Sequence, residues 1–130
     1  MKLVLDINII VSALLSPLGL PAKILNIVLN GSATIIYDNS VLAEYVDVLG
    51  REKLKIDQEL KNLIIAFIEK EGIYIIAEPH DIKFIDRDDK TFYDLYKSGD
   101  VDYLITGNKK HFPEEKGIIT AREFIEINKW

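Results

Sequence analysis

Residues 86–113 read DRDDKTFYDLYKSGDVDYLITGNKKHFP, and this stretch contains a helix signal followed closely by a strand signal. Asp88 can cap a helix whose apolar face includes Phe92, and Gly99 can end that helix. Residues 103–106 then form a short apolar run that suits a strand. A helix followed by a strand after a short turn is typical of parallel α/β folds, so this stretch sets the predicted fold class.

The same alternation extends outward from this stretch to both ends of the chain. Strands are predicted at residues 3–5, 34–37, 73–77, 103–106 and 118–120. Further helices are predicted from Pro21 to Gly31, after a cap at Asn39 or Ser40, from Asp57 to Gly72, and over residues 122–128. None of the strands alternates strictly between apolar and polar residues, which suits a sheet covered on both faces. The sequence therefore predicts a parallel α/β layer fold with helices on both faces of the sheet.

Size and composition limit the kinds of site that the chain can build. The 130 residues are 48% hydrophobic and show no repeat or linker, so we expect residues 1–130 to form a single domain. The absence of cysteine excludes disulfides and zinc–thiolate sites, and His80 and His111 lack zinc-ligand spacing. Any bound metal is therefore expected to take oxygen ligands.

The first residues, MKLVLDINIIVSALLSPLGLP, look like a signal peptide because a lysine precedes an apolar run. Asp6 and Asn8 interrupt that run, and no stretch of roughly 18 apolar residues occurs elsewhere. We therefore expect a cytoplasmic protein with no membrane association.

Three carboxylates break the apolar pattern of the elements that carry them. Asp6 ends the first strand, although it could equally cap the segment that follows. Glu44 lies at the border of its helix's apolar stripe, where most glutamates are simply solvated. Asp89 shares a helical face with Phe92 and Tyr96, although acidic residues at a helix start often serve the helix dipole.

These carboxylates follow successive strands of the predicted sheet. Asp6 follows the first strand, Glu44 the second and Asp89 the third, and Asn108 follows the fourth. Residues beyond the carboxyl ends of parallel strands converge on one crevice, where the strand order reverses. Several carboxylates in one crevice repel one another unless a hard divalent cation such as Mg²⁺ or Mn²⁺ binds there. Such a pocket suits hydrolysis of a phosphodiester.

The charge balance restricts how such a pocket could hold a nucleic acid. With 16 Lys and Arg against 21 Asp and Glu, the formal net charge is −5, which argues against a broad basic surface. Lys109 and Lys110, directly after Asn108, are the best placed to hold an RNA backbone, with Lys90 and Arg51 further candidates. Each of these side chains could also be merely solvated.

Four segments resemble the PIN domain, in particular the VapC-like toxins of toxin–antitoxin systems. They are DINIIVSALL at residues 6–15, SVLAEYVDVLGREK at 40–53, the stretch at 86–113, and IITAREFIE at 118–126. The most specific mark is the acidic helix start followed about nineteen residues later by the Thr-Gly-Asn turn. The resemblance covers essentially the whole chain.

This resemblance implies a three-layer α/β/α sandwich with a five-stranded parallel sheet. It also implies a Mg²⁺- or Mn²⁺-dependent endoribonuclease that leaves a 5′-phosphate. It implies that Asp6, Glu44 and Asp89 are catalytic and bind the metal, with Asn108 at a fourth position that is often aspartate. It also implies a small antitoxin partner and a homodimer. A sedimentation run that gave only a 14.8 kDa species would contradict the dimer.

Several nearby polar residues receive secondary roles. We expect Asn8 and Thr106 to orient the carboxylates, as residues around metal sites commonly do. Asp86 is a reserve fourth acid, whereas Asp102 ranks lower because it precedes the fourth strand. Ser40 is interpreted as a helix cap.

Three rival functions fit the sequence less well. A phosphoacceptor receiver domain would need a lysine after the fifth strand, where this chain has Arg122. A dehalogenase-type phosphatase would need Asp-x-Asp near the start, but the chain has Asp6-Ile7-Asn8. The stronger rival is a non-catalytic PIN module that binds RNA or a protein, which Asn108 suggests. RNA cleavage that Asp6→Asn abolishes would exclude this rival.

Overall fold

Strands and helices alternate along most of the chain in the computed structural model, which describes residues 1–83 and 86–130. The strands are β1 (Lys2–Leu5), β2 (Thr34–Tyr37), β3 (Ile73–Tyr74), β4 (Tyr103–Ile105) and β5 (Ile118–Ile119). The helices are α1 (Ile7–Leu15), α2 (Leu20–Leu29), α3 (Asn39–Leu49), α4 (Gln58–Glu71), α5 (Arg87–Ser98) and α6 (Ala121–Asn128). Two 3₁₀ turns, η1 (Glu52–Leu54) and η2 (Lys109–His111), lie between them.

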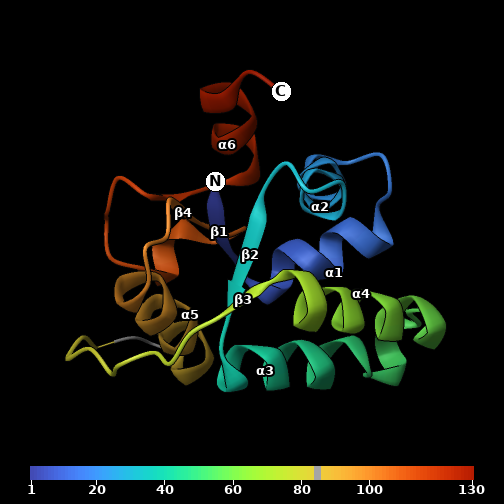
Figure 1. Cartoon of the computed structure of the whole chain (residues 1–130), viewed down its shortest axis with the longest axis horizontal. Helices are drawn as coiled ribbons and strands as arrows, with labels where there is room; N and C mark the ends of the chain where they lie inside the picture. The colour runs from blue at the N-terminus through green and yellow to red at the C-terminus, as the bar shows by residue number, and fades with distance from the viewer. Residues whose placement is uncertain (84–85) are drawn as a thin grey trace.

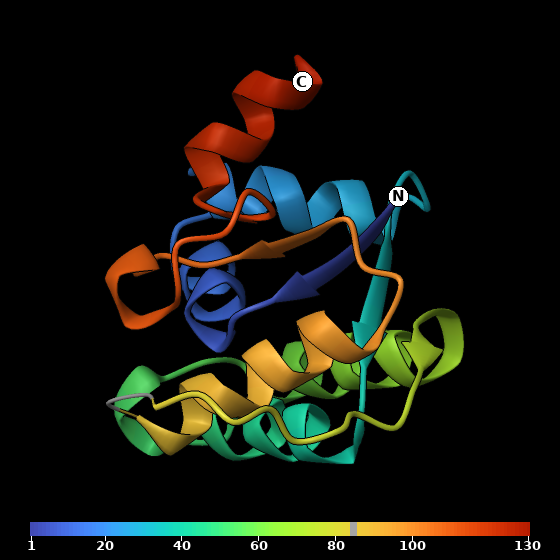
Figure 2. The same cartoon turned by 90° about the vertical axis from the view of Figure 1, so that its left-hand side faces the viewer.

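The five strands form one parallel sheet in the order β3-β2-β1-β4-β5, so the predicted fold class is confirmed. Helices α1, α2 and α6 cover one face of the sheet, and α3, α4 and α5 cover the other (Figure 1). The buried side chains of all three layers join in one hydrophobic core. The strand order reverses between β1 and β4, whose carboxyl ends point to the same side of the molecule (Figure 2).

Local signals explain where several helices begin and end. Pro21 lies in the first turn of α2, and Gly31 follows the helix with a φ of 87°, the left-handed conformation that glycine adopts without strain. The Asp57 side chain accepts a hydrogen bond from the N–H of Glu59 and caps α4. These predicted ends are therefore confirmed.

Two predicted caps are wrong, because in each case an aspartate just before the helix takes the role. Asp38, not Asn39 or Ser40, caps α3 and accepts from the N–H of Val41 at 2.8 Å. Asp86, not Asp88, caps α5. Both aspartates have extended backbone angles, which allow a carboxylate to reach the free N–H groups of the first turn. The two predicted caps of α3, Asn39 and Ser40, are exposed residues inside its first turn.

Two other elements differ from the sequence-based prediction. Helix α1 is not among the predicted helices, because only Asn8 and Ser12 interrupt its apolar INIIVSALL sequence and its polar face is narrow. The third strand ends at Tyr74 rather than at residue 77, although the N–H of Ile75 still donates to the carbonyl of Tyr37. β3 lies at the edge of the sheet, and Tyr74 and Ile76 are exposed there. Packing against the core therefore does not hold the residues after Tyr74 in the strand.

No single helix in the described ranges is long and apolar enough to cross a membrane. Helices α1 and α2 together reach that length, but a bend of 102° separates them. Both helices bury apolar residues in the core, which accounts for their hydrophobic sequences.

Candidate active site

A hollow of about 210 Å³ lies at the carboxyl edge of the sheet, beside the point where the strand order reverses. Its lining residues are Asp6, Ile7, Asn8, Glu44, Val48, Arg51, Asp86, Asp88, Asp89, Phe92 and His111. The three carboxylates singled out from the sequence, from β1, α3 and α5, therefore share one hollow. Two of the predicted secondary residues, Asn8 and Asp86, line it as well.

Asp6 is the most deeply buried of these carboxylates, with 2% of its surface exposed. Its Oδ2 accepts a hydrogen bond of 2.7 Å from the hydroxyl of Thr106, which is itself fully buried. Asp6 precedes α1, but its side chain makes no capping hydrogen bond there. Burial raises the pKa of the Asp6 carboxyl above its ordinary value, and the Thr106 hydroxyl and the backbone of Ile7 and Asn8 oppose this rise.

Asp89 lies in the first turn of α5 and is 9% exposed. Its Oδ2 is buried and lies 3.1 Å from Nδ1 of His111, a contact that lowers the pKa of the carboxyl. Burial raises the pKa of the Asp89 carboxyl first, and the nearby charges of Asp6 and Asp86 raise it further. The predicted electrostatic conflict between carboxylates is therefore present.

Glu44 reaches the hollow from α3, the helix that follows β2, and is partly buried. Burial raises the pKa of its carboxyl, and the negative charges of Asp88 and Asp47 raise it further. Arg51 acts in the opposite direction and also lines the hollow, but its guanidinium pairs with Asp47 at 3.0 Å. The hollow thus carries five acidic residues against one arginine and one histidine.

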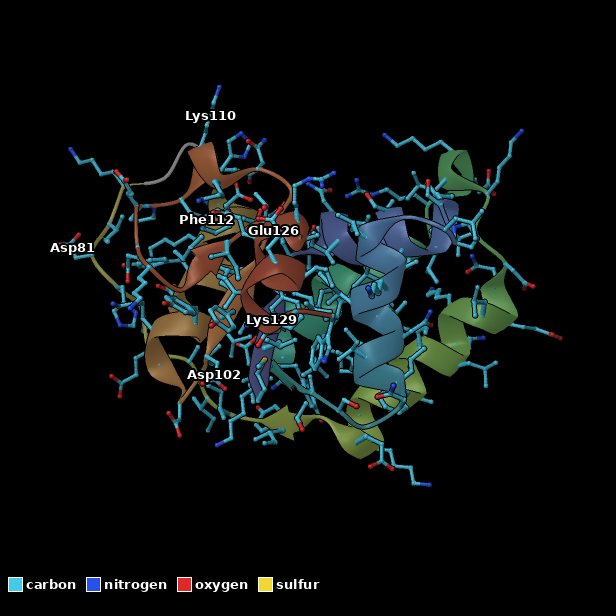
Figure 3. The ribbon with its side chains drawn as sticks, turned by 90° about the horizontal axis from the view of Figure 1, so that it is seen from above. Asp81, Asp102, Lys110, Phe112, Glu126 and Lys129 are labelled. Carbon is cyan, nitrogen blue, oxygen red and sulfur yellow. The ribbon has the colours of Figure 1, made fainter. Side chains whose placement is uncertain are left out.

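Some residues predicted to act at the site lie outside the hollow. The main-chain N–H of Asn108 donates to the Thr106 hydroxyl, but its amide lies 3.0 Å from Nε2 of His111 and is not part of the lining. Lys109 is paired with Glu123 at 3.0 Å. Lys110 lines a neighbouring hollow of about 320 Å³ and projects outward in Figure 3.

Asp102, which ranks low as a fourth acid in the sequence analysis, lies away from the hollow. Its Oδ2 accepts a hydrogen bond of 2.7 Å from the N–H of Lys2, at the amino ends of β1 and β4. In Figure 3 Asp102 and Lys110 lie on opposite sides of the view, because the first precedes β4 and the second follows it. Asp102 therefore belongs to the other edge of the sheet.

His111 is the main site residue that the sequence did not reveal. It lines the hollow because η2 turns the chain back after Asn108 and brings the imidazole against Asp89. Asp88, interpreted from the sequence as a cap, is also part of the lining. The signal for His111 was its position three residues after the Thr-Gly-Asn turn, but that position has meaning only once the turn is known to fold back.

The chemistry of the lining suits a hard divalent cation. The donors are mostly carboxylate oxygens, burial raises their pKa values, and neighbouring carboxylates raise those of Glu44 and Asp89 further. The buried Oδ2 of Asp89 has only the His111 ring beside it within the described residues. Within residues 1–83 and 86–130, no three histidine or acidic side chains are spaced to ligate one ion directly. A cation that keeps several waters, as Mg²⁺ does, fits this spacing.

The sequence matches the family model of the PIN domain over residues 2–110, so the chain belongs to the PIN domain family. Proteins of this family are generally nucleases and generally use a divalent metal. A similar solved structure is VapBC2 from Rickettsia felis bound to a DNA fragment from their promoter, with a TM-score of 0.61 and 22% identity. The match covers 92% of this chain and 97% of that chain and supports the same fold. No curated protein matches the sequence.

Proposed function

We propose that this protein is a metal-dependent endoribonuclease that hydrolyses phosphodiester bonds of RNA and leaves a 5′-phosphate. The observation that carries the proposal is the meeting of Asp6, Glu44 and Asp89 in one hollow from three separate elements. Membership of a family of nucleases supports the reaction class.

Each carboxylate has a proposed role that follows from its surroundings. Asp6, Glu44 and Asp89 would hold Mg²⁺ or Mn²⁺, which when bound would supply an activated water and positive charge toward the phosphate. Thr106 keeps the Asp6 carboxylate in one orientation through its hydroxyl. Asn8, at the exposed rim, is placed to donate to a phosphate oxygen.

Positive side chains near the hollow give the RNA backbone few contacts. Arg51 lies in the lining itself and is the best placed to contact a phosphate. To do so, its guanidinium would leave the carboxylate of Asp47 and bind the substrate instead. Lys110 is exposed beside the neighbouring hollow, and Lys109 would have to leave Glu123. We propose both lysines as outer contacts to RNA.

We further propose that this nuclease acts in the cytoplasm as the toxin of a toxin–antitoxin pair. Two likenesses support this proposal: that of the sequence to VapC-like toxins and that of the fold to VapBC2 of Rickettsia felis. A small antitoxin and a second copy of this chain are the proposed partners. The sedimentation measurement described above tests the second copy.

The alternative function is a non-catalytic PIN module that binds RNA or a protein. The position of Asn108 favours it, because the amide contacts His111 and does not line the acidic hollow. We prefer the nuclease because the hollow keeps five acidic residues without this fourth position.

Cleavage of a panel of structured RNAs in the presence of Mg²⁺ or Mn²⁺ tests the proposal. The wild-type chain should cleave at least one RNA, and EDTA should stop the reaction. Asp6→Asn should lower the rate by at least about 100-fold, because the substitution removes a buried anionic ligand without changing its shape.

The matched control is Asp102→Asn, which makes the same chemical change at the opposite edge of the sheet. This variant should cleave at the wild-type rate. Cleavage that survives in Asp6→Asn, or that resists EDTA, would contradict the proposed site.

A further inference from the structure

His111 is placed against the acidic hollow by a continuous set of hydrogen bonds. The hydroxyl of Thr106 donates to Asp6 and accepts from the main-chain N–H of Asn108. The carbonyl of Asn108 then accepts from the main-chain N–H of His111 at 3.0 Å, which closes the η2 turn. The backbone that carries His111 is therefore tied directly to the partner of the Asp6 carboxylate.

The contact between His111 and Asp89 has the spacing of two ligands of one ion. Nδ1 of the imidazole lies 3.1 Å from Oδ2 of Asp89. Two donors at about 2.1–2.2 Å from an ion and at right angles to each other lie roughly 3.0–3.1 Å apart. The same Asp89 oxygen is buried, and within the described residues no group other than this ring nitrogen is placed to partner it.

The other side of the imidazole is held by Asn108. Its Nδ2 lies 3.0 Å from Nε2 of His111. The two ends of an asparagine amide exchange places when the amide is turned over, and with its carbonyl oxygen toward the ring it would accept from Nε2–H. That tautomer leaves the lone pair of Nδ1 directed to Asp89 and the hollow, the arrangement in which histidines commonly bind metals.

We propose that His111 is a nitrogen ligand of the divalent ion in this hollow, beside Asp89, and that Asn108 positions its ring. This inference rests on the proposed function, because it assumes that the hollow binds a divalent ion. It assigns the position nearest Asp89 to a residue that the sequence did not single out. Asn108 then acts through His111 and not as a ligand.

A nitrogen ligand changes which ion the hollow prefers. Imidazole suits later first-row metals such as Ni²⁺, whereas carboxylate and water ligands suit Mg²⁺ and Mn²⁺. The wild-type chain should therefore bind Ni²⁺ about tenfold or more tightly than Mg²⁺, and His111→Gln should reduce that difference.

The direct test is electron spin-echo envelope modulation of the full chain with Mn²⁺ below one equivalent. A coordinated imidazole gives a ¹⁴N modulation, and labelling the protein with [¹⁵N]histidine should replace it with the ¹⁵N pattern. The chain has only two histidines, so His80→Gln leaves His111 as the sole source of the signal. His80 faces Asp94, with Nδ1 3.3 Å from Oδ1, and does not line the hollow.

The inference predicts the modulation in the wild-type chain and in His80→Gln, and its loss in His111→Gln. Bound Mn²⁺ without any histidine modulation in the wild-type chain would overturn the inference and leave the proposed nuclease site standing. A signal that disappears in His80→Gln would also overturn it. Failure of the wild-type chain to bind Mn²⁺ at all would contradict the proposed function itself, and the inference with it.

Discussion

At the residue scale, the buried carboxylate of Asp6 lowers the stability of the fold, although it suits the proposed metal site. Its carboxylate is 2% exposed, and the Thr106 hydroxyl, nearby backbone groups and His111 compensate only in part for the water it has lost. Burying a charge in this way costs folding free energy in the absence of a cation. The proposed metal ligand Asp6 therefore lowers the stability of the metal-free protein.

Asp6→Asn should stabilise the metal-free protein at pH 7, by on the order of 1 kcal/mol. Because burial raises the pKa of Asp6 above its ordinary value of 3.8, stability from its neutral form is present below pH 3.8 and lost as pH rises through the folded pKa. Asparagine keeps the neutral form at every pH and can still accept from Thr106. Denaturant unfolding in EDTA measures the difference.

The gain from Asp6→Asn should shrink as the pH falls toward 3.8. Glu115 and Glu123 have lowered pKa values, so the stability that their charged forms contribute is lost in acid in both proteins. Comparing the variant with the wild type at each pH cancels this shared loss and leaves the effect of Asp6. Asp81→Asn, at an exposed position, is the control and should change little at any pH. A variant less stable than wild type at pH 7 would show that the charge of Asp6 supports the fold.

The sequence could predict the carboxylates of the site because each one breaks the pattern of its own element. Asp6 interrupts an apolar strand, and Asp89 falls on the inward face of α5. His111 breaks no pattern, since it lies in a short turn among charged residues. Its role depends on where η2 places the ring, and that depends on long-range contacts.

At the scale of elements, Tyr45 connects the three parts of the chain that carry the carboxylates. It is fully buried on α3 directly after Glu44, and its hydroxyl donates to the carbonyl of Leu5, directly before Asp6. Its ring also lies 5.9 Å from that of Phe92, one turn after Asp89 on α5. One side chain therefore fixes α3 against both β1 and α5.

Tyr45→Phe should lower the free energy of unfolding by about 1–2 kcal/mol, because a buried carbonyl loses its donor while the ring still fills the core. It should also weaken Mn²⁺ binding several-fold, since β1 and α3 lose their direct connection beside the site. Chemical unfolding and Mn²⁺ titration measure the two effects.

Tyr37→Phe is the matched control, because its hydroxyl also donates to a main-chain carbonyl, that of Glu69 on α4, at 3.3 Å. This variant should lose some stability and keep its affinity for Mn²⁺. Equal Mn²⁺ affinity in Tyr45→Phe and wild type would mean that Tyr45 supports only the core.

The sequence predicted the elements best where composition changes sharply at their ends. Strands β1, β2, β4 and β5 lie within one residue of their predicted bounds, since each is a short apolar run between polar residues. Helix α1 lacks such contrast, because it packs in the interior beside α2 and stays apolar on most sides. The short β3 could not be foreseen, because its end depends on its place at the sheet edge.

At the scale of the whole molecule, the charge distribution means that the proposed contact with RNA needs a cation. The formal net charge is −5, and several basic side chains are already paired with carboxylates. The pairs are Lys2 with Asp100, Arg51 with Asp47, Lys90 with Asp94, Lys97 with Glu115 and Lys109 with Glu123. An acidic hollow on an acidic chain can accept a phosphate only with positive charge between them.

Crystals grown with Mn²⁺ test directly whether the acidic hollow binds a cation, because the anomalous signal of manganese locates the ion without assumptions about its ligands. A peak should lie in the hollow, within ligand or water-bridged distance of the carboxylates of Asp6, Glu44 and Asp89. An ion bound elsewhere, or no peak at a Mn²⁺ concentration that supports RNA cleavage, would contradict the shared metal site.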